Sequence, residues 1–590
     1  MNWFLISIKE KGTYNTNISI KEKIQYEFPM NNINEISFRK YNINSCYATN
    51  REINNLKSQF EEIVIIGDIK IHNKRELKNK YNFADLYLQT NESLISKMYR
   101  QKGINCIDDI IGEFSFVIID QKTEKIYAVR DQVGIKPLFW IHTNDEYIFS
   151  SDIFLLRDFF NVQELNYSYF SEFYERDGIM DIPLTPFKNV NRIPSGHYML
   201  IDRKEETFNN YWDLSNIKDK IQYSNESEYL DNFLALLDES VNSRIIEGNY
   251  NSVLLSGGLD STSIYALSKK NNNNIVSSVS AVFDELRDCD ERKYFEDLLK
   301  KYKDKGNYVN LDNKLMFEDF PNNTPFTYEP SIVSLSHEFS LNTAKYSVEK
   351  GLYNVLTGFG GDQLLTGSLY ITRDFLKKLK FRELFSFLTD YSIYTNTSAL
   401  RNMISHTLNP NIEKHFVRNK SNYYKYIQKK FKSIATYNQK ELYFQISNAK
   451  AHLYLDRTIG GMTGADMNHP FLDRRLIEFV YKIPGNLRFT PTYSKYILRK
   501  SMHELLTPSI ADRLNKTTHL AYTYKSLKKN WGSIIKVINN PTIVNRLDLI
   551  SEKDWKENIG RWRNGLEVPS EFWTLLAIEL WINKFIQRFG

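Results

Sequence analysis

The chain has 590 residues, 42% of them hydrophobic, and this length predicts two or more folded domains. A net charge of +6 is small for such a chain and does not by itself indicate nucleic-acid binding. The three cysteines have no metal-ligand spacing, the N-terminus is not a signal peptide, and no apolar run approaches the about 20 residues of a membrane helix. We therefore expect a cytoplasmic protein with no membrane span and no nucleic-acid partner.

The first part of the chain, residues 1–205, has the pattern of short strands separated by turns. Residues 61–71 are strand-like, and residues 112–140 contain two strands around a turn at 121–124. A polar stretch at 203–227 follows. The sequence therefore predicts a first domain over residues 1–205.

From residue 226 onward, helical patterns alternate with apolar runs, which is typical of a parallel α/β unit. Residues 229–244 are a helix candidate that leads into a short buried strand at 253–255. The next strand covers residues 275–283, and such strand ends commonly line an adenine pocket. We expect a second domain over residues 226–590 that ends in a packing helix at 571–589.

Residues 256–261, SGGLDS, lie between the predicted strand at 253–255 and a predicted helix. In such a turn, backbone N–H groups and the helix dipole both favour a bound anion. The motif is not a Walker A loop, because no Lys directly follows its last glycine. An ordinary tight turn is the alternative, but the several specified positions favour a phosphate site.

Residues 353–367, YNVLTGFGGDQLLTG, form a second motif, in which a short strand ends before a glycine-rich loop. Gly358, Gly360 and Gly361 leave room for the carboxylate of Asp362. The loop and its carboxylate are therefore a candidate functional site. The alternative is a glycine loop that only caps a helix.

Residues 454–500 contain the third motif, with Asp466 four residues before PFLD and Lys495 before a predicted helix. By its spacing alone, Lys495 has the pattern of a surface lysine. Residues 373–443, which precede this motif, are predicted to be mainly helical and carry no functional motif.

The SGGLDS motif resembles the loop of the PP-loop ATP pyrophosphatases, and all three motifs resemble the synthetase domain of B-type asparagine synthetases. The resemblance implies that the protein binds ATP with Mg²⁺ and cuts ATP to AMP and pyrophosphate. It assigns ATP and pyrophosphate binding to Ser256, Gly257, Gly258, Asp260, Ser261, Gly360 and Gly361. It also assigns Mg²⁺ to Asp260 and Asp362, phosphate stabilisation to Lys495, and orientation or deprotonation of an amine to Asp466.

The first domain contains the phrases GDIKIHNKREL, GEFSFVIID, VRDQVGIKPLFW, FSSD and IPSGHYML, which resemble the N-terminal domain of the same synthetases. This implies an α+β, Ntn-type sandwich of the class II glutamine amidotransferases, followed by an α/β PP-loop domain. That family uses an N-terminal Cys as nucleophile, whereas position 2 here is Asn2. Neither Cys46 nor Cys106 has a free α-amine beside its thiol. We therefore expect a glutaminase fold that does not hydrolyse glutamine.

Two positions depart from the asparagine synthetase pattern in the second motif. Phe359 and Gln363 stand where those enzymes carry acidic residues. The resemblance places both residues at the acceptor pocket. Loss of the two carboxylates favours an acceptor larger and less polar than aspartate.

The whole pattern looks most like a lasso peptide cyclase, a macrolactam synthetase of ribosomal peptide biosynthesis. This resemblance implies ring closure between a peptide N-terminal amine and an Asp or Glu side chain. It also implies a precursor core peptide as substrate, and a leader-binding protein and a leader peptidase as partners. The alternatives are an asparagine synthetase that uses free ammonia, a β-lactam synthetase-like enzyme, and a nucleotide-binding scaffold without turnover.

Overall fold

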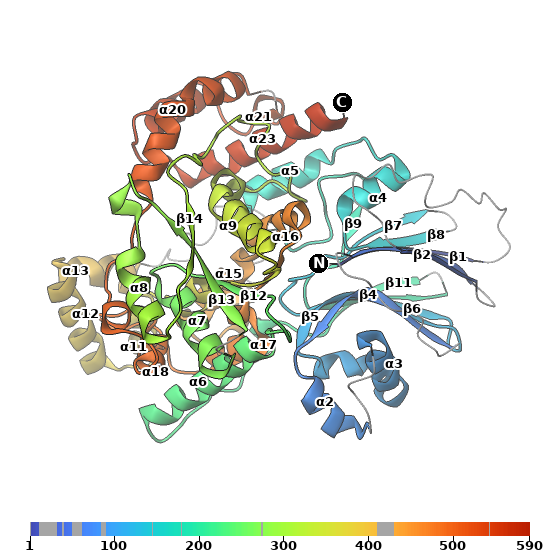
Figure 1. The fold of residues 1–590 in the computed structure, drawn as a ribbon, viewed down its shortest axis with the longest axis horizontal. Coiled ribbons are helices and arrows are strands. Elements are labelled where there is room, and N and C mark those ends of the chain that lie inside the picture. The colour runs from blue at the N-terminus through green and yellow to red at the C-terminus, as the bar shows by residue number, and fades with distance from the viewer. Residues whose placement is uncertain are drawn as a thin grey trace. The chain divides into compact units, whose positions relative to one another are not determined.

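The computed structural model describes residues 2–10, 32–37, 41–49, 62–83, 90–143, 146–178, 180–203, 205–272, 275–409, 430–541 and 543–589 (Figure 1). The chain divides into two compact units, the first made of Met1–Ser171 and Met180–Asp213, and the second made of Glu172–Ile179 and Leu214–Arg588. The change of unit at Leu214 lies between the two predicted domains. The segment 172–179 was expected in the first domain but packs with the second unit, where the Thr574 hydroxyl donates to the Asp177 carboxylate at 2.7 Å.

Two antiparallel sheets form the first unit, with strand orders β2-β3-β1-β8-β7-β9 and β11-β10-β6-β5-β4. The first sheet contains β1 (Asn2–Glu10), β2 (Asn32–Ser37), β3 (Tyr41–Thr49), β7 (Phe139–Thr143), β8 (Glu146–Ser150) and β9 (Asn191–Arg192). The second contains β4 (Ile63–Ile71), β5 (Gly112–Asp120), β6 (Lys125–Arg130), β10 (His197–Asp202) and β11 (Glu205–Asn210). The strands predicted within 61–71 and 112–140 are confirmed, including the turn at 121–124.

The second sheet of this unit is apolar on both faces. Val64 and Ile66 of β4 pack with Phe4 of β1, whereas Ile63 and Ile65 pack with the helices on the other face. Side chains alternate between the faces of a strand, so a strand that is buried on both sides has an almost continuous apolar sequence. The helices of this unit are α2 (Lys74–Tyr81), α3 (Asn91–Lys102), α4 (Ile153–Phe160) and the start of α5 (Tyr167–Glu175).

A buried carboxylate organises the loop after β6. Asp131 Oδ1 accepts hydrogen bonds from the N–H groups of Val133 (3.1 Å), Gly134 (2.7 Å) and Ile135 (3.0 Å), and Oδ2 accepts one from Lys136 (2.9 Å). Burial raises the pKa of Asp131 to about 6, although these bonds and Arg130 favour the charged form. The loop conformation therefore depends on one side chain.

We expect Asp131→Ala to destabilise the first unit by about 3 kcal/mol, because buried N–H groups lose their acceptor. Asp131→Asn keeps one carbonyl oxygen and should cost less. Amide hydrogen exchange over residues 131–137 measures the difference. Equal protection in the wild type and both variants would contradict this role.

A five-stranded parallel sheet forms the centre of the second unit, in the order β14-β13-β12-β15-β16. Its strands are β12 (Asn251–Leu254), β13 (Val276–Val282), β14 (Asn307–Asn310), β15 (Asn354–Leu356) and β16 (Asp466–Asn468). Helices lie on both of its faces (Figure 1), among them α6 (Glu226–Asn242), α7 (Leu259–Asn272), α8 (Arg292–Lys301), α9 (Glu338–Glu349) and α16 (Lys450–Thr463). The predicted parallel α/β arrangement is confirmed.

The strand order reverses beside β12. The chain adds β13 and β14 on one side of β12, and later adds β15 and β16 on the other. In open parallel sheets, ligands bind at such a point, outside the carboxyl ends of the two strands from which the order diverges. The loops that follow β12 and β15 occupy this position, and they are the first two sequence motifs.

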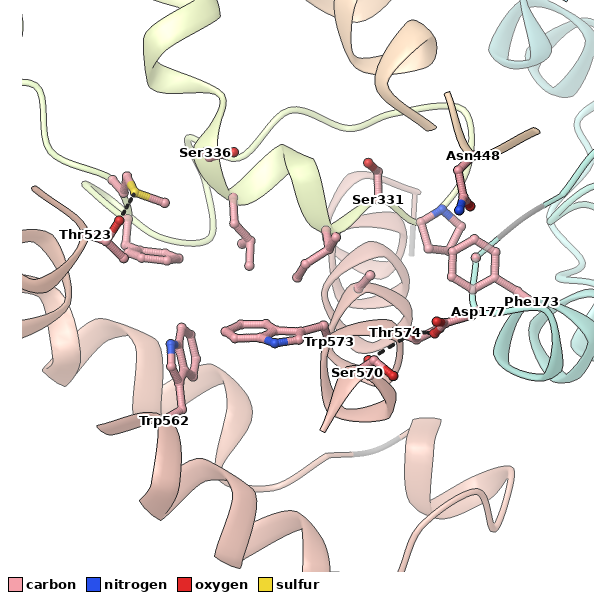
Figure 2. Close-up of a pocket in the computed structure, with 17 residues that line it drawn as sticks. Phe173, Asp177, Ser331, Ser336, Asn448, Thr523, Trp562, Ser570, Trp573 and Thr574 are labelled. Carbon is pink, nitrogen blue, oxygen red and sulfur yellow. Dashed lines mark hydrogen bonds between the residues drawn. The ribbon is translucent and has the colours of Figure 1, made fainter. Parts of the chain in front are cut away.

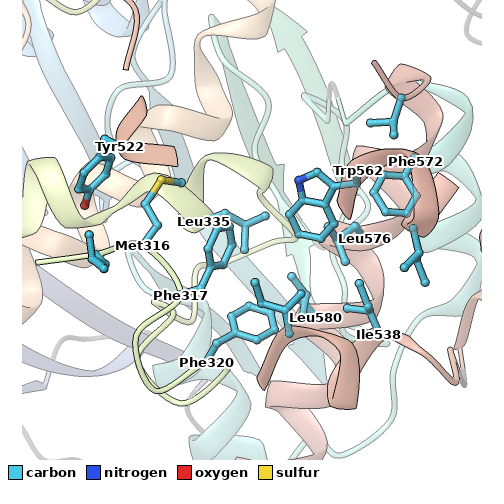
Figure 3. Packing of buried hydrophobic residues seen from close by; sticks show 14 of the residues in the cluster. Met316, Phe317, Phe320, Leu335, Tyr522, Ile538, Trp562, Phe572, Leu576 and Leu580 are labelled. Atoms are coloured by element: carbon cyan, nitrogen blue, oxygen red, sulfur yellow. The ribbon is translucent and has the colours of Figure 1, made fainter. Parts of the chain in front are cut away.

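The C-terminal part of the second unit is helical and packs around aromatic side chains (Figure 3). Its main helices are α20 (Leu520–Ile538), α22 (Glu552–Arg563) and α23 (Ser570–Phe589). Trp562 and Phe572 from these helices pack with Phe317, which lies between β14 and α9. The packing helix predicted at 571–589 is confirmed as α23.

The remaining helices of this unit are α10 (Gly361–Leu365), α11 (Ile371–Lys377), α12 (Phe381–Thr395), α13 (Ala399–Asn402), α15 (Tyr437–Asn448), α17 (Arg474–Lys482), α18 (Tyr496–Met502), α19 (Pro508–Ala511) and α21 (Ile543–Arg546). The region 373–443 is helical as predicted where it is described, and residues 410–429 lie outside the described part. No helix among the described residues is long and apolar enough to cross a membrane.

Candidate active site

The two glycine-rich loops and a third segment line one cavity of about 540 Å³. The cavity opens at the carboxyl ends of β12 and β15, where the strand order reverses. Its lining includes Ser256, Gly258, Asp260 and Ser261 from the first loop, Thr357, Gly358, Phe359 and Asp362 from the second, and Ser494 and Lys495 from the third segment. The tertiary structure thus brings the three sequence motifs together.

Hydroxyl groups hold the first loop in a tight turn. The Ser256 N–H donates to Ser261 Oγ at 3.1 Å, and the Gly258 N–H donates to Ser256 Oγ at 3.2 Å. The hydroxyls of Ser256 and Ser261 also share a hydrogen bond of 2.9 Å. Helix α7 begins directly after this turn, at Leu259, so its N-terminal dipole points into the cavity.

An ion pair between Glu291 and Arg513, which the sequence did not predict, holds the same loop in place. The Gly257 N–H donates to Glu291 Oε2 at 3.0 Å, and Arg513 Nη1 donates to the Gly257 carbonyl at 2.6 Å and to Glu291 Oε1 at 3.1 Å. Arg513 also stacks on the ring of Tyr294 at 3.7 Å. Glu291 lies directly before α8, but its carboxylate makes no side-chain cap there and faces the loop. No motif links positions so far apart, so the sequence carried no signal for this pair.

Glycines in the second loop allow the two loops to approach closely. A Cβ atom on Gly358 would lie 2.7 Å from the backbone nitrogen of Ser261, and one on Gly361 would lie 2.5 Å from Asp260 Cγ. Gly360 has a φ of 93°, which side chains rarely adopt. Gly358, Gly360 and Gly361 therefore shape the site through the backbone.

Lys495 joins the two predicted metal ligands. Its Nζ donates to Asp260 Oδ2 at 2.5 Å and lies 2.7 Å from Asp362 Oδ1. Lys516 contacts the other oxygen of Asp362 at 3.0 Å. Burial alone would lower the pKa of Lys495, but the two carboxylates outweigh it and raise that pKa. Burial also acts against ionisation of Asp362, yet the two lysines hold its pKa at about 2.

The backbone of Lys495 is itself constrained. Lys495 lies directly before α18 with a φ of 56° and a ψ of 37°, in the left-handed region that few residues with side chains adopt. Its side chain is 10% exposed. The constraint directs a buried ammonium toward the two loops, so the surface-lysine alternative is wrong.

The carboxylates of Asp260 and Asp362 fit a magnesium ion that is shared with phosphate. Asp260 Oδ1 is buried without a hydrogen-bond partner, and burial raises the pKa of this carboxyl group. Asp362 is 51% exposed toward the cavity side. Among the described residues, no group of three His, Cys, Asp or Glu side chains is arranged to hold a metal ion. Two carboxylates suffice for Mg²⁺ when substrate phosphates and water complete its shell.

A smaller cavity of about 160 Å³ adjoins the first loop. It lies at the ends of β12 and β13 and is lined by apolar groups such as Val279, Ala281 and Phe339, together with Ser256. The strand predicted at 275–283 is confirmed as β13, and its end lines this cavity. Its position beside the phosphate-type loop suits an adenine ring.

Two predicted residues do not line the main cavity. Asp466 begins β16 opposite Asn354, at the amino end of the strands, so its role toward an amine stays a prediction. Gln363 lies on α10 with a buried, unpartnered Oε1 atom, next to the loop and outside the lining. Phe359, by contrast, lies in the cavity wall.

The second unit also contains an apolar cavity of about 480 Å³, away from the three motifs (Figure 2). Trp562, Trp573 and Phe173 contribute its aromatic walls, and the Asp177–Thr574 hydrogen bond lies at its edge. It contains none of the predicted catalytic residues.

The sequence of the chain matches the models of two known families. A model of the asparagine synthase family matches residues 232–583, and a model of the glutamine amidotransferase domain matches residues 49–212. The chain therefore belongs to the asparagine synthase family, with an N-terminal glutamine amidotransferase-type domain.

Two relatives from Bacillus subtilis (strain 168) show how much the chain differs in sequence from other members of the family. The chain is 26% identical over 528 residues to a glutamine-hydrolyzing asparagine synthetase 2, covering 80% of this chain and 66% of that protein. It is 23% identical over 455 residues to a glutamine-hydrolyzing asparagine synthetase 3, covering 71% and 69%. The chain thus spans just under two thirds of the first relative.

We expect Lys495→Ala to lower the rate of AMP formation by roughly 100-fold, as removal of a preorganised positive group does, with a smaller effect on ATP affinity. Lys500→Ala, on the exposed side of the same helix, is the matched control. Initial rates at varied ATP concentration separate the two effects. A pure loss of ATP affinity would reject the assignment.

We expect Gly361→Ala to reduce AMP formation by roughly 100-fold, because displacement of Asp260 by about an ångström misaligns the site. Gly532→Ala is the control, since a Cβ there meets no atom within 4 Å. Circular dichroism checks that both variants keep the fold. Full activity of Gly361→Ala would show that the close approach of the loops is not required.

Proposed function

We propose that the protein is an AMP-forming carboxylate–amine ligase, which activates a carboxylate with ATP and joins it to an amine. The observation that carries this proposal is the contact of Lys495 with Asp260 and Asp362 between the two loops at one cavity. Three separate segments place one cation and two anions where phosphate and metal charge would be balanced. Family membership supports the same reaction class.

In the proposed reaction, the residues that line the cavity have separate roles. The Ser256–Ser261 loop and the start of α7 bind the pyrophosphate end of ATP, and the cavity at the ends of β12 and β13 takes the adenine ring. Mg²⁺ held by Asp260 and Asp362 would neutralise phosphate charge. The ammonium group of Lys495 stabilises the charge on the α-phosphate while the substrate carboxylate attacks. Pyrophosphate leaves, and an amine then displaces AMP.

The acceptor that we propose is a peptide amine, so that the product is a macrolactam of the lasso peptide type. The supporting observation is that Phe359 lies in the lining of the cavity, where its side chain is aromatic. An aromatic wall favours a peptide backbone over free aspartate. A precursor core peptide, a leader-binding protein and a leader peptidase are the corresponding substrate and partners, and the cytoplasm the corresponding compartment.

The first domain does not offer an evident glutaminase nucleophile. Cys106 is buried, and burial raises the pKa of its thiol to about 12, so it is not a thiolate near neutral pH. Cys46 lies on β3, and its side chain is outside the described part of the structure. We therefore propose that the amine comes from the substrate itself.

The alternative is an asparagine synthetase that uses free ammonia; the relatives are named asparagine synthetases, although glutamine-hydrolyzing ones. It needs the same cavity and the same acyl-adenylate, and it differs only in the acceptor. Activity with defined acceptors therefore decides between the two.

We expect AMP release from ATP and Mg²⁺ with a synthetic core peptide, accompanied by loss of one water from the peptide in mass spectrometry. Aspartate with ammonia, tested in parallel, should give background AMP only. AMP release with aspartate alone would establish the asparagine synthetase instead. Absence of AMP in every mixture, with ATP still bound, would leave a nucleotide-binding scaffold.

A further inference from the structure

The imidazole of His452 lies on the ring of Phe359, the residue that stands where asparagine synthetases carry an acidic side chain. His452 of α16 lines the cavity, and its ring stacks on Phe359 with centroids 4.0 Å apart and an angle of 17°. The imidazole is 29% exposed, so it is accessible from the cavity. Its plane is therefore fixed by Phe359 at the acceptor wall.

A buried carboxylate lies behind this imidazole. Asp456, one helical turn after His452, is 3% exposed, and its Oδ2 lies 3.5 Å from Nε2 of both His452 and His469. Neither oxygen of Asp456 has a hydrogen-bond partner in the structure. A buried carboxylate without partners is costly, so it favours an N–H group on each facing nitrogen.

The second imidazole connects Asp456 to the glycine-rich loop. His469 Nδ1 and Thr357 Oγ1 share a hydrogen bond of 2.8 Å, and Thr357 Oγ1 accepts one from the Phe359 N–H at 3.2 Å. A chain of contacts therefore leads from His452 through Asp456, His469 and Thr357 to the backbone of Phe359. This connection fixes Asp456 relative to the site where the carboxylate is activated.

The carboxylate determines which nitrogen of His452 can accept a proton. When Nε2 carries its hydrogen toward Asp456, the neutral imidazole has a free lone pair on Nδ1. This is the arrangement in which a buried acidic group orients a histidine base. We assign this tautomer to His452 because its Nε2 is the nitrogen that lies 3.5 Å from Asp456 Oδ2.

The other charged side chains of the cavity are poorly suited to accept a proton. Asp260 and Asp362 are paired with Lys495, and Asp362 also with Lys516. The remaining charged groups in the described lining are lysine and arginine, which are cations at neutral pH. His452 is the one imidazole in the described lining, and a neutral imidazole has a ring nitrogen that can accept a proton.

We propose that His452 is the general base for the amine in the second half of the reaction, and that Asp456 is its positioning residue. This inference rests on the proposed function. The amine nitrogen forms the bond to the acyl carbon, the bond from that carbon to the AMP oxygen breaks, and AMP leaves with the electron pair. The proton lost by the amine goes to Nδ1 of His452 and then to solvent.

The test separates activation of the carboxylate from attack by the amine. Hydroxylamine is uncharged at neutral pH and traps acyl-adenylates as hydroxamates without needing a base. With the core peptide, we expect His452→Gln to form hydroxamate within about threefold of the wild-type rate and to form the macrolactam at least about 100-fold more slowly. Retained hydroxamate formation also demonstrates that the variant is folded, and His452→Asn is the second variant.

Two further variants test the role of the carboxylate. Asp456→Asn should slow macrolactam formation by about tenfold or more, and combination with His452→Gln should add little, because Asp456 acts through that imidazole. His503→Gln, at an exposed histidine outside the site, is the matched control and should behave as wild type in both assays.

The outcomes are distinguishable. Wild-type macrolactam formation by His452→Gln would overturn the base assignment and leave the ligase function intact. Equal loss of hydroxamate and macrolactam would also overturn it, because His452 would then serve activation or folding. Absence of hydroxamate from the wild type with both the core peptide and aspartate would overturn the proposed function itself.

Discussion

The rest of the site depends on one interaction, the contact of the Lys495 ammonium group with two carboxylates. This ammonium group contacts Asp260 and Asp362, two carboxylates that would otherwise repel each other across the loops. The left-handed backbone of Lys495 and its burial direct this cation toward the loops. In the proposed reaction, the two carboxylates would hold Mg²⁺ and the ammonium group would face phosphate, so this contact keeps the charged groups of the site together.

The sheet and its glycines make this contact possible. Reversal of the strand order beside β12 places the carboxyl ends of β12 and β15 next to each other. Gly358 and Gly361 then let the second loop touch the first at distances that a Cβ atom would prevent. Glu291 and Arg513 brace Gly257 from the other side, so the phosphate loop is held by parts of the chain that lie far apart in sequence.

The acceptor side of the cavity has a different character from the phosphate side. Phe359 replaces an acidic residue of the asparagine synthetase pattern, and its ring packs flat against His452. The base that we propose, His452, lies on α16. Its Nε2 atom faces Asp456, which also contacts His469. A wall with an aromatic ring and an imidazole suits the acceptor that we propose, an amine on a substrate larger than aspartate.

The sequence by itself determined the fold class, the parallel sheet, and the three motifs, since their signals are local: apolar runs, glycine turns and charged positions at fixed spacing. The assignment of Asp260, Asp362 and Lys495 to one site came from the resemblance to asparagine synthetases, because spacing alone gave Lys495 the pattern of a surface lysine. Only the tertiary structure decided which other residues join them. Glu291, Arg513 and His452 belong to none of the three motifs, and Asp466, which belongs to the third, lies at the amino end of its strand. Contacts between distant segments follow from strand order and helix packing, which no short stretch of sequence records.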